Sequence, residues 1–191
     1  PKVLSDIADQ VADIVTVTLD HSIVRDRLVG TARLSTGQAE SVGALGLVAR
    51  ASGVNTDARL EHPFVDLGEE FHIVTETGGD VHARYLVRGR EFAISIAVAK
   101  DLIERLGVSP KPVSPGSATA SRAGLGIVEG WRGTIYHRVE LDPDGNLSRV
   151  KIVDPSFFNW PALPIALADT IVPDFPLVNK SFNLSYSGND L

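Results

Sequence analysis

Cysteine and methionine are both absent from this sequence of 191 residues. Without cysteine, the chain itself cannot form thiolate zinc sites, iron–sulfur clusters, thiol nucleophiles or disulfides. Lysine and arginine never gather into a block, and the formal net charge is −6. This charge argues against a nucleic-acid binder, because such proteins need a basic surface for the phosphate backbone.

Long hydrophobic runs are missing as well. Mostly apolar stretches such as Phe92–Ala99 fall far short of the ~20 residues that a membrane-spanning helix needs. The first residues carry Asp6, Asp9 and Asp13 where a signal peptide would have a basic region followed by an apolar one. We therefore expect no signal peptide, and any membrane contact would run through a partner.

The composition that remains is that of a folded protein, with 43% hydrophobic and 22% charged residues. Apolar residues recur at helical spacing over residues 4–28, where Ser5 is the expected N-cap. Ser35 and Gln38 have the spacing of a capping box, which predicts a helix to about Arg50. A third helix is expected from Asp80 to Leu106.

The pattern changes in the second half of the chain. Residues 127–141 and 147–153 are strand-like and flank the turn sequence of residues 142–146, which predicts a β-hairpin. A short helix should follow over residues 161–168, and then an irregular tail over residues 181–191. The fold class is therefore α+β, a long-helix bundle with a β-hairpin and a short C-terminal helix.

We expect one packed domain with three parts. Residues 1–108 would form a helical core, residues 109–122 a crossing loop rich in Pro, Ser and Gly, and residues 123–191 the hairpin and tail.

Few residues suggest catalysis or metal binding. The five histidines have no spacing that would put two ligands on one helix face, so we expect no metal site. Gly43 and Gly46 lack the context of a phosphate-binding loop and are better explained by close approach of a neighbouring backbone. No Gly-x-Ser-x-Gly motif supports a serine hydrolase.

Arg132 is the more informative residue, because it lies between Gly130 and Gly133 in an expected strand. There it would offer a permanent cation to a ligand or a partner. His137 would face the opposite side of a regular strand, unless a bulge near Gly133 turned one of the two. The alternative is an ordinary surface arginine in a hairpin.

The segment from Glu129 to His137 reads Glu-Gly-Trp-Arg-Gly-x-x-x-His. It resembles the Glu-Ala-Pro-Arg-Gly-x-x-x-His segment of nickel–iron hydrogenase large subunits. The large peripheral-arm subunit of respiratory complex I and the formate-hydrogenlyase-type hydrogenases share the core of that segment. Further segments that resemble this family, in the same order, are Gly30–Ser35, Arg50–Gly53, Asp57–Arg59, His62–Phe64 and Gly79–Glu91.

The tail departs from the hydrogenase pattern. Hydrogenases of this family end near Asp-Pro-Cys-x-x-Cys, whose thiolates hold nickel and iron, whereas Ser185 and Gly188 stand at those positions here. Serine is a weak ligand for a soft metal and glycine is none, so this end of the chain cannot build a nickel–thiolate centre. The family's upstream cysteine pair would lie before Pro1. The valine and glutamate usual in complex I at the two tail positions are absent too.

The resemblance implies a cavity at the place of the lost metal centre. Arg132 would face it, Trp131 would fill part of it, and Pro176, Ser181 and the tail would line the rest. The cavity-lining candidates are thus Arg132, Trp131, His137, Glu129, Ser185 and Gly188. Catalytic residues cannot be assigned, because the family's quinone headgroup ligands lie in an N-terminal part that this chain lacks.

The resemblance therefore implies a subunit, or the C-terminal part of one, of a membrane-associated NADH:quinone oxidoreductase or hydrogenase-like complex. Such a subunit would not be catalytic alone and would hold no cofactor itself, while a quinone and the cluster of an iron–sulfur partner subunit are implied by the family. Its location would be cytoplasmic, peripheral to the inner membrane through membrane subunits. The alternative is a non-catalytic scaffold or assembly module. A hydrogenase with residues lost from the sequence is disfavoured, because Ser185–Gly188 runs without a gap.

Overall fold

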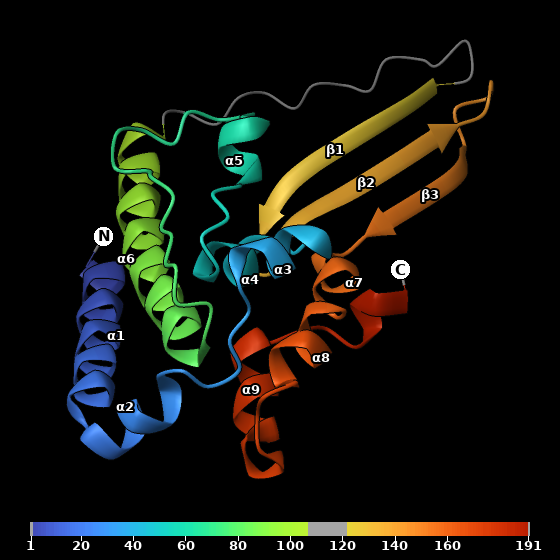
Figure 1. Cartoon of the computed structure of the whole chain (residues 1–191). Helices are drawn as coiled ribbons and strands as arrows, with labels where there is room; N and C mark the ends of the chain where they lie inside the picture. The colour runs from blue at the N-terminus through green and yellow to red at the C-terminus, as the bar shows by residue number, and fades with distance from the viewer. Residues whose placement is uncertain (1, 107–121, 191) are drawn as a thin grey trace.

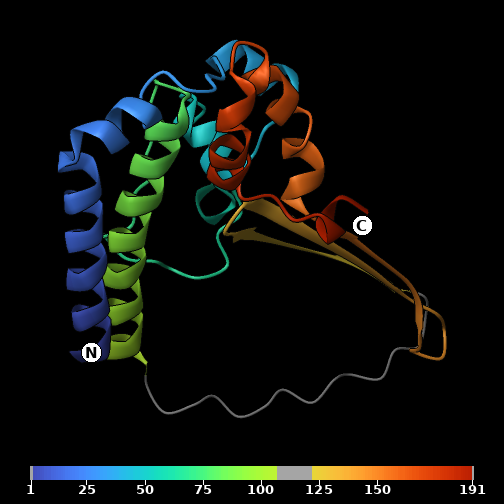
Figure 2. The ribbon, with the colours of Figure 1, turned by 90° about the horizontal axis from the view of Figure 1, so that it is seen from below.

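The computed structural model describes residues 2–106 and 122–190. Helices come first, then a three-stranded sheet, then further helices, in agreement with the α+β prediction. Figures 1 and 2 show a pair of antiparallel helices on one side, the C-terminal helices on the other, and the sheet extending away from both. The predicted crossing loop lies outside the described residues, apart from Arg122, which begins the first strand.

The N-terminal helical region is divided in two. Helix α1 spans Lys2–Asp20 and α2 spans Ser22–Leu28. His21 separates them with an extended backbone, at φ −78° and ψ 103°. The prediction of one helix over residues 4–28 with Ser5 as its N-cap is therefore wrong at both points, since α1 already begins at Lys2.

The predicted helix after Ser35 is also broken. The capping box of Ser35 and Gln38 is confirmed and begins α3 (Thr36–Ser41), but α4 (Gly46–Ala51) is a separate helix. Gly43 and Gly46 both have positive φ, a conformation that ends a right-handed helix. The predicted close approach is confirmed for Gly46, where an added Cβ would lie 2.3 Å from the carbonyl oxygen of Arg132.

The long third helix is confirmed as α6 (Val81–Arg105). Asp80 is its N-cap and accepts a hydrogen bond from the backbone N–H of Ala83. The short α5 (Ala58–Glu61) precedes it. Helix α6 packs against α1, α4 and the C-terminal helix α9 (Phe175–Phe182). No helix among the described residues is both long and apolar enough to cross a membrane.

The sheet contains one strand more than predicted. Strands β1 (Arg122–Gly130), β2 (Gly133–Leu141) and β3 (Leu147–Val153) pair antiparallel in the order β1-β2-β3. The predicted β2–β3 hairpin is confirmed. The single strand predicted over residues 127–141 is wrong, because Gly130 pairs with Gly133 and leaves Trp131 and Arg132 as a two-residue loop. Two close glycines mark such a loop more often than a strand interior.

The C-terminal region is more regular than predicted. The elements after the sheet are α7 (Pro155–Asn159), α8 (Ala162–Leu167), η1 (Val172–Asp174), α9 (Phe175–Phe182) and η2 (Ser187–Asp190). Helix α8 confirms the predicted short helix. Helix α9 was not predicted, because Pro176 suggested a break, yet proline is well tolerated in the first turn of a helix, where Pro176 lies.

The hydrophobic core lies among the helices rather than under the sheet. Its best-buried side chains come from α4, α6 and α9, which are distant in sequence but packed together. Much of the sheet is exposed on both faces, in keeping with its projection from the body in Figures 1 and 2. The end of the sheet nearest the helices is therefore the part that carries the candidate site.

Candidate functional site

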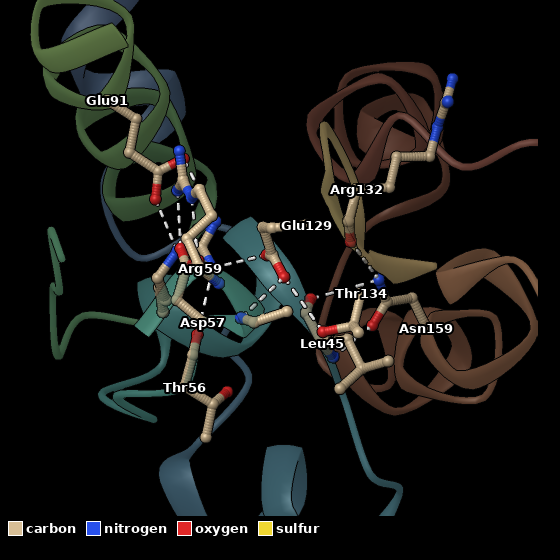
Figure 3. Close-up of polar contacts among 11 residues, drawn as sticks. Leu45, Thr56, Asp57, Arg59, Glu91, Glu129, Arg132, Thr134 and Asn159 are labelled. Carbon is tan, nitrogen blue, oxygen red and sulfur yellow. Dashed lines mark hydrogen bonds and ion pairs between the residues drawn. The ribbon is translucent and has the colours of Figure 1, made fainter. Parts of the chain in front are cut away.

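A buried ionic cluster is centred on Arg50, near the end of α4. Arg50 is only 1% exposed. Its Nε lies 2.5 Å from Oε1 of Glu91, and its Nη2 lies 3.2 Å from Oε2 of the same carboxylate. Its Nη1 lies 2.9 Å from Oε1 of Glu129 and 3.3 Å from Oδ2 of Asp57. Arg50 also donates to the carbonyl of Thr56. One guanidinium thus joins three separate segments of the chain. Figure 3 shows the carboxylates of Glu91, Asp57 and Glu129, which come from these segments.

Each carboxylate of this cluster is held by its own secondary structure. Glu91 lies on α6, and Asp57 is the N-cap of α5 and also pairs with Arg59 at 2.6 Å. Glu129, near the end of β1, accepts hydrogen bonds from Thr134 Oγ1 and from the backbone N–H of Ala58. Glu129 therefore ties the β1–β2 hairpin to the helical body.

The electrostatics favour the charged forms of Arg50 and Asp57. Burial disfavours the cation of Arg50, but Glu91 and Glu129 more than offset this and raise the pKa of Arg50. Burial likewise disfavours the anion of Asp57, yet hydrogen bonds and charge from Arg59, with the charge of Arg50, lower the pKa of Asp57. The charged groups of this cluster bond one another and the nearby backbone. We therefore interpret the cluster as positioning the hairpin, not as binding a ligand.

A second group of arginines binds the end of α9. Arg84, which is fully buried, donates to Ser181 Oγ and to the carbonyls of Ala32 and Gly79. Its guanidinium also lies 4.4 Å from the ring centroid of Phe182. Burial lowers the pKa of Arg84 to about 9, so the side chain is still protonated at neutral pH. Among the described residues, no carboxylate forms an ion pair with it.

Trp131 and Arg132 form the tip of the β1–β2 hairpin and face this second group. Arg132 Nε donates a short hydrogen bond to the carbonyl of Asn183, directly after α9. The ring of Trp131 lies 5.8 Å from the guanidinium of Arg88, which itself donates to the carbonyl of Ser181. In Figure 3 the side chain of Arg132 points away from the Arg50 cluster. The tip thus joins α6 to the tail.

Asn159 fixes the backbone of this tip. Its side-chain amide donates to the carbonyls of Arg132 and Leu45, and its oxygen accepts from the N–H of Leu45. Together with the contact at Gly46, these bonds hold the hairpin tip against the start of α4.

Ser185 and Gly188, the two tail positions that the resemblance aligns with metal ligands of hydrogenases, lie together in one turn. The hydroxyl of Ser185 accepts a hydrogen bond from the N–H of Gly188 at 3.0 Å. A Cβ at Gly188 would lie 2.5–2.8 Å from the carboxylate atoms of Asp154, which occupies the space that a side chain there would need. The donors and the space required for a nickel–iron centre do not fit this turn.

The six predicted site residues are therefore not all brought together. Arg132 bonds the tail at Asn183, Trp131 lies against Arg88, and Ser185 and Gly188 form the turn after Asn183. Glu129 belongs to the Arg50 cluster. His137 is exposed and, by the strand pairing, lies on the opposite face of the sheet from Glu129.

Two further predicted residues are also separated. Pro176 lines a hollow of about 340 Å³ with Asn183 and Tyr186, whereas Ser181 is buried beneath Arg84 and Arg88. Among the described residues, no group of three or more His, Cys, Asp or Glu side chains is placed to hold a metal ion.

Comparisons with known proteins identify the family of this chain. The model of the family described as respiratory-chain NADH dehydrogenase, 49 Kd subunit, matches residues 1–122. The chain belongs to this family. Formate hydrogenlyase subunit 5 of Escherichia coli strain K12 is 30% identical over 182 residues, which cover 95% of this chain and 32% of that protein. An NADH-quinone oxidoreductase subunit of Salinispora arenicola is 28% identical over 180 residues, which cover 90% of this chain and 46% of that protein.

The whole chain shares its fold with a solved structure. A chain of the membrane-bound sulfane sulfur reductase, an archaeal respiratory membrane complex, matches with a TM-score of 0.89 at 24% identity. The match covers 100% of this chain and 54% of that one. The chain thus spans about a third to a half of the curated relatives and about half of this solved one.

Charged residues of the family motifs form the buried cluster around Arg50. Four of the motif segments supply Arg50, Asp57, Glu91 and Glu129, which the structure brings together. Sequence reasoning missed this because it treated each motif as a mark of resemblance and gave its charged residues no partners. Arg88 and Asn159 were missed as well, and no local pattern around them indicates their contacts.

Proposed function

We propose that the chain is a subunit, or the C-terminal part of one, of a membrane-associated redox complex of the NADH:quinone oxidoreductase and hydrogenase type. The observation that carries this proposal is the contact between the hairpin tip and the tail. Arg132 donates to the carbonyl of Asn183, close in sequence to Ser185 and Gly188, the two positions that the resemblance aligns with metal ligands of hydrogenases. This subunit shapes a site for partners and does not perform redox chemistry alone.

Three arginines define the chemical character of the proposed site. Arg84, Arg88 and Arg132 all bind the segment from Ser181 to Asn183, two of them through its carbonyls. Arg132 is half-buried and Trp131 is about half exposed, so the tip remains accessible to a partner or a ligand. A ligand that accepts hydrogen bonds, such as a quinone, suits a guanidinium in this position. The cluster of an iron–sulfur partner subunit would supply the electrons.

The intact complex should contain no nickel bound by this chain. Ser185 and Gly188 offer no thiolate, and Asp154 fills the space beside Gly188. Elemental analysis of the complex, purified through a tag on this chain, checks this expectation. Nickel in a one-to-one ratio that is lost when Ser185 is replaced by alanine would contradict it.

The substitution Arg132→Ala should lower electron transfer to a soluble quinone analogue in the intact complex by about tenfold. A hydrogen bond from a charged donor is worth about 1.5–3 kcal/mol, which corresponds to a factor of ten or more. The measurement is steady-state quinone reduction, together with binding of the analogue.

A matched control is Arg138→Ala, which removes an exposed arginine from the same sheet. This variant should leave quinone reduction unchanged. If Arg132→Ala also leaves both binding and electron transfer unchanged while the complex still assembles, the chain is a scaffold or assembly module instead.

A further inference from the structure

Asn159, which is 0% exposed, connects the hairpin tip to the start of α4. Its amide nitrogen donates to the carbonyl of Arg132 at 3.1 Å and to the carbonyl of Leu45 at 3.2 Å. Its amide oxygen accepts from the N–H of Leu45 at 2.8 Å. An asparagine amide has two N–H groups, so both are used in this one contact. Leucine and aspartate are close to asparagine in size, but neither can make the same three bonds.

The two backbone segments that Asn159 joins lie in direct contact. A Cβ at Gly46 would overlap the carbonyl of Arg132, and a Cβ at Gly133 would lie 2.8 Å from Cβ of Leu45. Both glycines have positive φ, at 59° and 133°, a conformation that other residues rarely adopt. Two glycines thus let the hairpin tip approach α4, and the side chain of Asn159 holds the two segments together.

Helix α7, which ends at Asn159, also holds the tail. The hydroxyl of Ser156, at the start of this helix, accepts from the N–H of Ser185 at 3.0 Å. Trp160, directly after the helix, donates from Nε1 to the carbonyl of Ser185 at 3.1 Å. Helix α7 therefore binds the backbone on both sides of the contact between the tip and the tail.

The place of the Arg132 guanidinium depends on these backbone contacts. Its Nε donates to the carbonyl of Asn183, and its own carbonyl is held by Asn159. Among the described residues, its two Nη groups donate no hydrogen bond, so they are the groups that a ligand would meet. A shift of the tip would move these donors with it, and a misplacement of about 1 Å can cost about 100-fold in rate.

We propose that Asn159 is a positioning residue, which holds the backbone of Arg132 so that its guanidinium meets the hydrogen-bond acceptor of a quinone-type ligand. Asn159 does not contact the ligand itself, because it is buried and both of its N–H groups are used. The proposal rests on the proposed function, since it requires that Arg132 binds the ligand.

The kinetics of quinone-analogue reduction by the intact complex test this role, with the amount of assembled complex measured separately. Asn159→Leu removes all three bonds and should raise KM for the analogue at least about fivefold, while kcat per assembled complex changes less than about twofold. Asn159→Asp keeps the acceptor for Leu45 but cannot donate to two carbonyls, so it should also raise KM. A purely structural role would lower the amount of assembled complex and leave KM unchanged.

Combining two substitutions shows whether Asn159 acts through Arg132. In the Arg132→Ala background, Asn159→Leu should change KM by less than a further factor of about two, because the group that it positions is gone. An equal fold-change in both backgrounds would overturn the proposal. The control is Leu28→Ala, which removes a buried side chain from α2 and should leave KM unchanged even where less complex assembles.

The outcomes separate this proposal from the proposed function. If Arg132→Ala raises KM and the Asn159 variants leave it unchanged, the proposed function stands and the positioning role is refuted. If Arg132→Ala itself has no effect, both fail. Where Asn159→Leu does not assemble, Asn159→Asp carries the same test in both backgrounds. If neither variant assembles, Asn159 is needed for the fold itself and the proposal is overturned.

Discussion

Arg50→Ala should lower the free energy of unfolding by about 3–5 kcal/mol, because it leaves buried carboxylates without their common cation. The side chains of Asp57 and Glu129 are 0% and 3% exposed, and that of Glu91 is 16% exposed. At this burial, water compensates the carboxylates less well than the guanidinium does. Denaturant unfolding, followed by circular dichroism, measures the loss.

The matched control for Arg50 is Arg90→Ala. Arg90 also pairs with a glutamate, Glu76, but its side chain is 55% exposed. Exposed ion pairs contribute about 0–1 kcal/mol, so this variant should unfold almost like the wild type. Equal losses in the two variants would show that burial gives the Arg50 cluster no special weight.

The free energy of unfolding should also depend on pH differently in the wild type and in Arg50→Ala. In the wild type, the folded state lowers the pKa of Asp57 from its ordinary value of 3.8. Asp57 therefore stabilises the folded state at pH values above 3.8, and this contribution is lost as the pH falls through the lowered pKa. In Arg50→Ala, Asp57 keeps its bonds to Arg59 but loses the charge of Arg50, so its pKa is lowered less in the folded state. As the pH falls below about 4, the stability of the wild type should therefore decrease more than that of the variant.

Arg84→Ala should cost about 3–5 kcal/mol for a different reason. The side chain fills the space between α6 and α9, so its removal leaves a cavity beside Phe182. It also leaves the carbonyl of Ala32 without its hydrogen-bond donor. Arg84→Lys should rescue little, because one ammonium cannot reach the three acceptors that the planar guanidinium bonds at once.

Thermal and denaturant unfolding of the Arg84 variants provide the check. Arg33→Ala is the control, since Arg33 is exposed and makes a single long hydrogen bond of 3.4 Å to the carbonyl of Gly78. We expect a change within about 0.5 kcal/mol for this surface residue. Full rescue of Arg84→Ala by lysine at the same position would mean that charge alone, and not the forked geometry, holds α9.

Three predictions that rested on neighbouring residues were confirmed, although the N-cap predicted at Ser5 was not. The capping box of Ser35 and Gln38, the start of the long helix next to Asp80 and the turn at residues 142–146 each depend on groups only a few residues apart. The errors arose where an amphipathic pattern continues through a change of direction. Periodicity does not register one extended residue at His21 or a two-residue loop at Trp131 and Arg132.

The sequence by itself determined that this chain has no sulfur to offer a metal, that it is an α+β protein and that its motifs are those of one family. Those properties are local or compositional, so no folding is needed to read them. Tertiary structure alone decided that Arg50 meets Glu129 across 79 residues and that Arg84 meets Ser181 across 97. Buried charges are stabilised by neighbours in space, and sequence separation carries no information about which carboxylate or carbonyl will be within hydrogen-bonding distance.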